Sequence, residues 1–522
     1  MGDGKEAEFS LKVMINKEKT KVLFAQVDSH FADFLLSFLT LPLGRIIKAL
    51  NKHYGDDEAP TVGSLSSLYH SLVNLDSSHF WTEGAKQTLL NPRSSIEDEY
   101  KRLKLDIADF QPPKTLYCTE HTWLNRIQSV SVYYDSINRF HTCGCGHTRI
   151  GKEDKEKTGC KAASGDGVFT INTASFVISD DLHILPVEAG LLGIILNLGI
   201  TGADKAEAIN VTFGFSEIMS LLKASLISQT PLSDLILNKS RHANSVIVGF
   251  EPGASINHLE DDQNPDSKKM ILKVVIQKST GTLLYAQAND DFVEFLFSFL
   301  NIPLGGVEHL LAGKTCAKAI NNLYLSIADL IDDKYFSTPG TKDRLMKPNV
   351  AHGCISDNHM LPLAEECLPD TYSGTTWFSA KFPNGKGSYL KGPRTYHVTD
   401  DLIVTPLCVV SVLSSLNKQK IAIYDDVKEV ELQIGPKELH FVDIRHRDIL
   451  LVETGNDRMH MMRSAASAVG RCTHAAIRGG TLEAARKRRE PVQGVEEVSR
   501  QLNSVSAVFL FSCTAVSAAF LF

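Results

Sequence analysis

One stretch of the chain occurs twice, and this repetition limits the fold more than any other feature of the sequence. Residues 31–46 read FADFLLSFLTLPLGRI, and residues 292–307 read FVEFLFSFLNIPLGGV, 261 positions later. Residues 11–44 align with residues 272–305 without a gap, and half of the 34 positions are identical. A long chain that repeats itself in this way is expected to fold as two copies of one unit.

The repeated block predicts a β-hairpin followed by a helix. In both copies, alternating apolar residues, a short polar segment and a second apolar run indicate two paired strands. Apolar residues then recur at helical spacing until Pro42 or Pro303 interrupts the helix. We expect Asp28 and Asn289 to cap the two helices. The residues that should be buried on the helices are Phe34 and Phe38 in the first copy, and Phe295 and Phe299 in the second.

A second pair of blocks follows at a different spacing. SFVISDDLHILP begins at Ser175, and TYHVTDDLIVTP begins at Thr395, 220 positions later. The second copy has therefore lost about 41 residues, 261 minus 220, between its two matched blocks. The paired aspartates at 180–181 and 400–401 could serve acid–base chemistry. Neighbouring strand residues point to opposite faces, however, so we predict that each pair lies in a hairpin turn.

Both copies continue with an apolar helical segment and a strand, but only the first then reads SEIMSLLKASL, an amphipathic helix. We therefore predict an α+β fold made by tandem duplication of a hairpin–helix unit, with two repeats and an irregular C-terminal tail. The halves should pack as a pseudo-twofold pair or as two beads. The predicted boundaries are 9–240 for the first repeat with a Cys/His insertion at 116–160, 241–267 for a linker, 268–440 for the shortened second repeat, and 441–522 for an atypical tail.

The quoted residues also resemble a known family. SLKVMINKEKTKVLFAQ, FADFLLSFLTLPLG, SDDLHILP and SLLKASLISQTPLSDLIL are similar to plant proteins of domain-of-unknown-function family 674. The resemblance covers roughly residues 9–440 and implies a plant protein that carries this unit in tandem. It implies no established activity, substrate or catalytic residue.

The insertion carries the pattern closest to a metal site. Four of the ten cysteines lie between Cys118 and Cys160, with histidines among them. Thiolates and imidazoles in two short clusters are the ligands of a structural zinc ion. The family resemblance implies paired cysteines at this point, whereas this chain has Cys-x2-His and Cys-x-Cys spacings. A structural zinc site, a degenerate former site and a redox site therefore stay open. The predicted zinc ligands are Cys118, His121, Cys143 and Cys145.

Another segment has part of a phosphate-binding motif. Gly313, Lys314 and Thr315 match the end of a phosphate-binding loop. That loop needs a glycine five positions before Gly313, where this chain has Glu308. A carboxylate there would repel phosphate, so we predict no nucleotide site.

The tail differs in composition from the rest of the chain. Residues 441–522 contain ten arginines and one lysine, whereas lysine is preferred elsewhere. One interpretation is a read-through or mis-spliced exon that is no genuine part of the protein. A second is a C-terminal membrane anchor, because residues 504–522 are 19 uncharged and mostly apolar residues. A third takes the basic run at 486–489 as a nuclear signal.

Composition limits the function. Of the residues, 43% are hydrophobic and 22% are charged, as in ordinary globular proteins. A net charge of −7 argues against a nucleic-acid partner. The first 20 residues show no apolar run of a secretory signal, so we expect a cytoplasmic or nuclear protein, or a C-terminally anchored one.

Because no complete catalytic motif is present, we predict a non-enzymatic interaction scaffold that binds a protein partner. A zinc-stabilised regulatory module is one alternative. The other is an enzyme, which would need His, Asp or Glu from both repeats to converge on a site between them.

Overall fold

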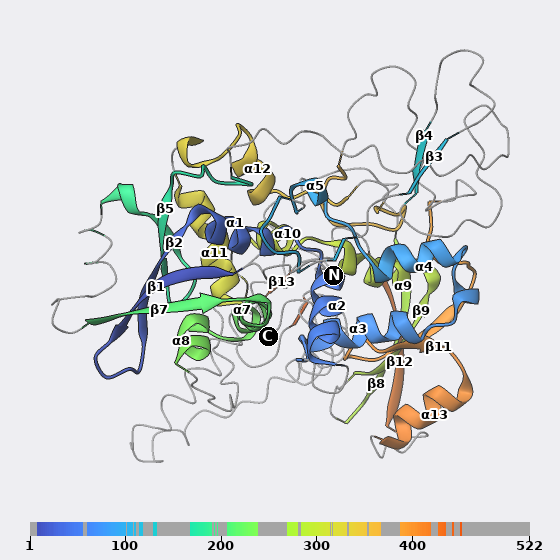
Figure 1. The fold of residues 1–522 in the computed structure, drawn as a ribbon. Helices are drawn as coiled ribbons and strands as arrows, with labels where there is room; N and C mark the ends of the chain where they lie inside the picture. The colour runs from blue at the N-terminus through green and yellow to red at the C-terminus, as the bar shows by residue number, and fades with distance from the viewer. Residues whose placement is uncertain are drawn as a thin grey trace, which may run out of the picture.

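The computed structural model describes a large part of the chain in several ranges. These are 8–110, 114–117, 129–132, 167–237, 269–366, 387–434, 441–442 and 449–450, with gaps at 56–59, 101, 108, 191–192, 194–195, 197–205, 280–282, 314, 316, 331–332, 352–353 and 419–425. Within them, helices and antiparallel sheets are combined (Figure 1). The α+β prediction is confirmed.

Two five-stranded antiparallel sheets have corresponding strand orders, β6-β5-β2-β1-β7 and β11-β10-β9-β8-β12. The first sheet contains β1 (Phe9–Asn16), β2 (Val22–Asp28), β5 (Ser175–Ser179), β6 (Ile184–Pro186) and β7 (Ala206–Phe213). The second contains β8 (Met270–Gln277), β9 (Leu283–Asn289), β10 (Thr395–Val398), β11 (Val404–Pro406) and β12 (Val427–Ile434). A register shift falls between Met14 and Ile15 and again at the corresponding Val275 and Ile276. The correspondence therefore extends to irregularities of the backbone.

The predicted hairpin–helix unit is present in both halves. Helix α1 (Ser29–Phe38) follows β2, and α9 (Asp290–Ser298) follows β9. Asp28 caps α1 by accepting a hydrogen bond from the Phe31 amide at 2.9 Å. Asn289 occupies the same position before α9, but its side chain makes no capping bond. All four predicted phenylalanines are at most 1% exposed, so their burial is confirmed.

Four of the remaining helical elements correspond between the halves. The first half has α2 (Leu43–Tyr54), α3 (Gly63–Asn74), η1 (Ser77–His79), α4 (Glu83–Leu90), α5 (Glu97–Tyr100), η3 (Val187–Ala189), α7 (Phe215–Ile227) and α8 (Pro231–Ile236). The second half has η5 (Phe299–Asn301), α10 (Leu304–Leu310), α11 (Lys318–Asp329), η6 (Asp333–Tyr335), α12 (Thr341–Met346) and α13 (Val409–Lys418). The corresponding elements are α2 and α10, α3 and α11, η1 and η6, and α4 and α12. Two short strand pairs stand apart from the large sheets, namely β3 (Lys114–Tyr117) with β4 (Ser129–Val132), and β13 (Phe441–Val442) with β14 (Ile449–Leu450).

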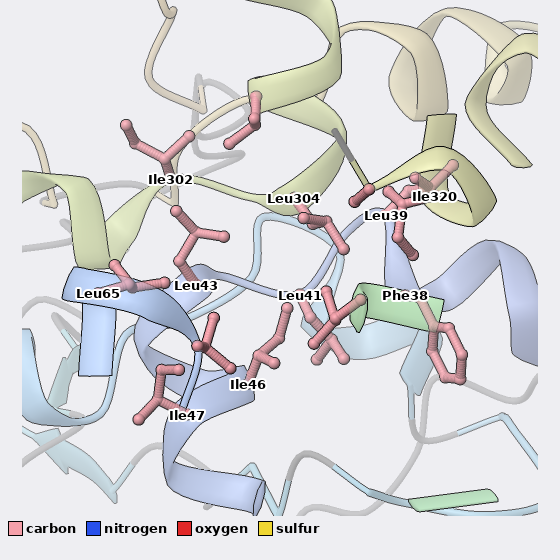
Figure 2. Close-up of a cluster of buried hydrophobic side chains, with 14 of the residues drawn as sticks. Phe38, Leu39, Leu41, Leu43, Ile46, Ile47, Leu65, Ile302, Leu304 and Ile320 are labelled. Carbon is pink, nitrogen blue, oxygen red and sulfur yellow. The ribbon is translucent and has the colours of Figure 1, made fainter. Parts of the chain in front are cut away.

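The two halves cross at the repeated Pro-Leu-Gly motif. Pro42 and Pro303 form an isolated antiparallel bridge. The Leu43 amide donates to the Ile302 carbonyl at 2.9 Å, and the Leu304 amide donates to the Leu41 carbonyl at 2.9 Å. Figure 2 shows the apolar side chains of this crossing gathered in one cluster. The block that occurs twice in the sequence is therefore one of the places where the halves contact each other.

The glycine of this motif is explained by the crossing. A β-carbon at Gly305 would lie 2.9 Å from the Leu39 carbonyl oxygen, closer than side-chain carbons come to backbone oxygens. A β-carbon at the corresponding Gly44 would lie 3.0 Å from the Leu300 β-carbon. Only glycine lets the two chain segments approach this closely.

Beyond the crossing, each half places a helix on the sheet of the other half. Helix α3 of the first half packs against α9 and β11, and α11 of the second half packs against α7 and β6 (Figure 1). The Val404 amide donates to the Ser71 hydroxyl at 2.9 Å, and the Ile184 amide donates to the Ser326 hydroxyl at 2.8 Å. One continuous hydrophobic core contains residues of both halves. The halves therefore form an intertwined pair and not two beads.

The halves differ after their last large strand. In the first half, β7 leads into α7 and α8, and Asp180 accepts hydrogen bonds from the Ser233 amide and hydroxyl, both at 2.7 Å. In the second half, the residues described after Ile434 are those of the short β13–β14 pair. The corresponding Asp400 is half-buried, and its pKa is raised by burial and by the neighbouring Asp401. Most of the residues that would correspond to α7 lie outside the described ranges, so the absence of this helix from the second half stays a prediction.

Candidate functional site

The predicted zinc ligands Cys118, His121, Cys143 and Cys145 lie outside the described residues. The zinc site therefore stays a prediction. Within the part of the chain that the structure describes, no group of three or more His, Cys, Asp or Glu side chains is arranged to hold a metal ion.

The two aspartate pairs lie in hairpin turns, as predicted. Asp180 and Asp181 connect β5 to β6, and Asp400 and Asp401 connect β10 to β11. The next residue in each turn, Leu182 or Leu402, has a positive φ of 63° or 55°. The pairs thus belong to a backbone turn that is built in the same way in both halves.

The residues around Gly313 serve to close a helix end. The Gly313 amide donates to the Glu308 carbonyl at 2.8 Å, and the Thr315 hydroxyl donates to the Glu308 carboxylate. Burial raises the pKa of Glu308 to about 8. A largely neutral carboxyl group at the end of α10 therefore occupies the place where the motif would need glycine. Lys314 lies outside the described residues.

The duplication supplies an internal control for finding a site. A side chain that the fold itself requires should have a similar counterpart in the other half. A polar cluster whose counterparts in the other half are apolar is not required by the fold, so it is a candidate functional site. The halves meet at two corresponding junctions, so the side chains of one junction can be compared with those of the other.

Two junctions connect the halves through corresponding backbone bonds. At the first junction, residues 333–337 of the second half meet residues 167–174 of the first half, and Phe336 bridges Thr170. At the second junction, residues 77–81 of the first half meet residues 387–394 of the second half, and Phe80 bridges Leu390. The Ile171 amide donates to the Tyr335 carbonyl at 3.0 Å in the first junction. Its counterpart in the second, the Lys391 amide, donates to the His79 carbonyl at 2.8 Å.

A buried carboxylate holds each junction loop. Asp33 accepts from the Val168 and Thr170 amides at 2.6 and 2.7 Å. Glu294, at the corresponding position of α9, accepts from the Tyr389 and Leu390 amides at 2.9 and 3.1 Å. Burial raises the pKa of both carboxyl groups, and the hydrogen bonds partly oppose this rise. Because both halves have such a carboxylate, we assign it to the fold.

The second junction contains a group of polar side chains whose counterparts at the first junction are aromatic or small. His79 comes from the end of η1, whereas Tyr396 lies on β10, Arg394 just before it and Asp290 at the start of α9. The His79 Nδ1 atom lies 3.0 Å from the Tyr396 hydroxyl oxygen. Asp290 accepts a hydrogen bond from the Arg394 amide at 3.4 Å. A β-carbon at Gly392 would lie 1.9 Å from Oδ2 of Asp290, so glycine is required there.

The surroundings of His79 and Tyr396 determine which of these two side chains carries a proton. Tyr396 is fully buried, and burial raises its pKa to about 12. Burial and the nearby Arg394 charge lower the pKa of His79. The phenol is therefore protonated and the imidazole neutral near pH 7. A buried phenol must donate its proton, so we assign the Tyr396 hydroxyl as donor to Nδ1, which leaves the hydrogen of His79 on Nε2.

At the first junction the corresponding positions hold aromatic or small residues. Tyr335 stands for His79, Phe176 for Tyr396, Ala174 for Arg394 and Ser29 for Asp290. The fold thus forms this junction without the polar cluster. Sequence reasoning missed the cluster because His79 lies outside both aligned blocks. The difference between Phe176 and the aligned Tyr396 lies within these blocks and could have been noticed.

A second candidate feature is the exposed side of α13. Its inner side chains, Val412 and Leu416, contact an apolar cluster on the outer face of the second sheet. Its outer side chains form an apolar surface, the α13 face, in which Val409 is 74%, Val410 75% and Leu413 41% exposed. The helix therefore has one broad apolar face, of which only a part is covered by the sheet.

No helix in the described ranges is both long enough and apolar enough to cross a membrane. Residues 504–522, predicted as one alternative to form an anchor, lie outside those ranges.

Comparison with known proteins places the chain in a family. The search of curated proteins and the search of solved structures gave no match. The profile of the family described as "Protein of unknown function (DUF674)" matches residues 5–437, which include both sheets and both junctions. The chain therefore belongs to the DUF674 family.

Proposed function

We propose that this protein is a non-enzymatic interaction scaffold that binds a protein partner through the α13 face. The observation that carries the proposal is the exposure of Val409, Val410 and Leu413 on one side of a short helix. A surface helix normally buries its apolar stripe, whereas part of the apolar stripe of α13 is exposed. Grouped apolar exposure is more informative than single exposed residues, because it often marks a contact surface.

The arrangement around α13 supports a preformed contact surface. Val412 and Leu416 hold the helix against the second sheet through Val275, Leu284 and Tyr285. The outer side chains are consequently presented on a packed support and not on a loop. Burying two valines and a leucine against a partner would contribute roughly 1.5–3 kcal/mol for each side chain, before the cost of association. A partner with an apolar groove or helix fits this surface.

The test compares binding by the full chain with binding by surface variants. The tagged chain is used to retain proteins from an extract, and a retained protein is then produced in pure form for titration. We expect Val409→Asp/Val410→Asp to weaken its binding at least tenfold, because two charges would have to be desolvated in the contact. The control Val73→Asp changes a valine that is 44% exposed on α3, and it should bind as the wild type does.

Circular dichroism and thermal unfolding first establish that the variants fold alike. A partner that binds both variants with the wild-type affinity would rule out the α13 face. Binding that is lost equally in both variants would also contradict the proposal, because the effect would not be specific to this surface.

A further inference from the structure

We propose that the second junction is an acid-sensitive contact between the halves, which loosens when the His79 imidazole takes up a proton, whereas the first junction does not respond. The contact uses one side chain from each half, His79 at the end of η1 and Tyr396 on β10. This inference goes beyond the scaffold function, because it concerns the connection between the halves and not the α13 face.

The two side chains are in direct contact at the place where the backbones of the halves are joined. Nδ1 of His79 lies 3.0 Å from the Tyr396 hydroxyl oxygen, and the ring centroids lie 5.5 Å apart. The Lys391 amide donates to the His79 carbonyl at 2.8 Å. The Trp81 amide donates to the Tyr389 carbonyl at 3.1 Å. A change in the side-chain contact therefore acts on the segment that connects the halves.

The hydrogen bond of this pair requires an unprotonated Nδ1 atom. The Tyr396 hydroxyl donates its hydrogen to Nδ1 while the imidazole is neutral. In the imidazolium form both ring nitrogens carry a hydrogen, so Nδ1 can no longer accept. Because Tyr396 is fully buried, its hydroxyl hydrogen then loses its acceptor without gaining water. A buried donor without an acceptor destabilises the closed junction, whereas opening lets water accept that hydrogen.

The charged groups around this pair belong to both halves. They are Asp76 before η1, Glu83 and Lys86 of α4, Lys391 and Arg394 before β10, and Asp290 and Glu294 of α9. Burial of the ring, and then the charge of Arg394, lower the pKa of His79, and Asp76 partly opposes this shift. Burial is the main reason for the high pKa of Tyr396, to which Asp290 and Glu294 add. His79 is therefore harder to protonate in the closed junction than in an opened one.

The direction of the pH effect follows from this difference. In an opened junction His79 has its ordinary pKa near 6.5, and in the closed junction its pKa is lower. Well above pH 6.5 the ring is neutral in both states, so this group does not affect opening. As pH falls through 6.5, the opened state binds the proton first, so opening becomes more favourable until the closed state is protonated as well. One proton can increase the opening equilibrium by at most about tenfold per pH unit.

The first junction is a matched control within the same chain. Tyr335 and Phe176 occupy the positions of the pair, and neither ring gains a proton between pH 5 and 7.5. Each junction also contains one buried carboxyl group with a raised pKa, Asp33 in the first and Glu294 in the second. Their titration acts in the same direction in both junctions. A pH effect confined to the second junction therefore points to the imidazole.

The test measures amide hydrogen exchange in the full chain by nuclear magnetic resonance between pH 5 and 7.5, at constant ionic strength. The Lys391 and Trp81 amides report on the second junction. The Ile171 and Ser337 amides, which donate across the first junction at 3.0 and 2.8 Å, report on the first. After correction for intrinsic exchange, the opening equilibrium of the second junction is divided by that of the first. We expect this ratio to be constant above pH 6.5 and to increase at least about threefold by pH 5.

Two variants assign the effect to the pair. His79→Tyr/Tyr396→Phe introduces the residues of the first junction, so the variant should keep the backbone contacts and lose the pH dependence of the ratio. His70→Gln removes an exposed histidine of α3 and should behave as the wild type does. The proposal is overturned if the wild-type ratio does not change between pH 7.5 and 5, or if a resonance titration places the pKa of His79 at or above 6.5. These two measurements need no variant. An equal increase of the ratio in His79→Tyr/Tyr396→Phe would also overturn it, because another group would then be responsible.

Discussion

At the first junction Phe336 bridges Thr170, and at the second Phe80 bridges Leu390, through backbone hydrogen bonds of the same pattern. A buried carboxylate, Asp33 or Glu294, supports both loops. The side chains above this common backbone are aromatic or small in one junction and polar in the other. The difference teaches that the intertwined fold needs the backbone pairing and the carboxylate, whereas the His–Tyr pair and the arginine are additional.

The same comparison applies to the ends of the two sheets. Asp180 is tied to α8 through Ser233, but Asp400 has no such partner in the described residues. The first sheet is thus continued by α7 and α8, while the second carries α13 on its outer face. Within the described residues, α7 and α8 are thus seen only beside the first sheet, and the α13 face lies on the second.

The largest expected effect comes from separating the halves. Residues 1–240 and 268–440, produced alone, should fail to unfold cooperatively, because α3 and α11 lose the surfaces that cover them. In the intact chain, the buried apolar side chains of these two helices include Leu65, Leu68 and Leu72 of α3, and Ile320, Leu323 and Ile327 of α11. Mixing the fragments during refolding should restore a cooperative transition in calorimetry. A fragment that melts cooperatively on its own would show that the halves are independent units.

A smaller effect is expected from the phenylalanines that occupy corresponding core positions. Phe38→Ala and Phe299→Ala should each lower the free energy of unfolding by about 3–5 kcal/mol, because each removes a fully buried ring. Each ring also packs edge-on against another phenylalanine, Phe34 or Phe295, with centroids 5.6 and 5.0 Å apart. Denaturant unfolding measures both losses. Costs that differ by several kcal/mol would mean that the halves are not equivalent in their cores.

Much of this fold could be predicted from the sequence because its local signals agree. Alternating apolar residues gave the hairpins, the spacing of Phe31, Phe34 and Phe38 gave the helix, and the aligned aspartates gave the turns. The packing of a helix of each half on the sheet of the other half could not be predicted. The periodicity of apolar residues predicts that Leu65, Leu68 and Leu72 are buried, but it does not indicate which half covers them. His79 and Tyr396 are 317 positions apart, so their contact exists only through that packing.

An intermediate effect is expected from pH, through a residue that differs between the halves. Glu308 is fully buried with a pKa of about 8, whereas Ile47 holds the corresponding position of α2. The unfolded chain has the ordinary glutamate value near 4.5. Between these two values the folded state binds the extra proton, so the stability contributed by neutral Glu308 is lost as pH rises from about 4.5 to 8. The slope approaches about 1.4 kcal/mol per pH unit.

Glu308→Gln removes this titration and keeps an oxygen that accepts from Thr315. Urea unfolding between pH 6 and pH 8 should therefore show a loss about 2–3 kcal/mol larger in the wild type than in the variant. The difference between the two proteins is the relevant quantity, because other buried carboxyl groups titrate in both. Parallel pH profiles would show that Glu308 is not buried as a neutral acid.

The smallest effect concerns the glycines at the crossing, and it distinguishes the halves most finely. Gly305→Ala would place a β-carbon 2.9 Å from the Leu39 carbonyl oxygen, a backbone atom that cannot turn away. Gly44→Ala would meet the Leu300 β-carbon at 3.0 Å and the Leu300 carbonyl oxygen at 3.1 Å. Overpacking of this kind costs about 1–3 kcal/mol, and the better helix propensity of alanine offsets up to about 1 kcal/mol.

Gly306→Ala is the matched control, since its nearest neighbour would be the Ile302 side chain at 3.4 Å. We expect Gly305→Ala to destabilise more than Gly44→Ala, and Gly306→Ala to be neutral or stabilising. Because the crossing joins the halves, Gly305→Ala should also weaken the reassembly of the two fragments, which Gly306→Ala should not. Equal stabilities for Gly305→Ala and Gly306→Ala would mean that the two chain segments do not approach each other as closely as the Pro42–Pro303 bridge requires.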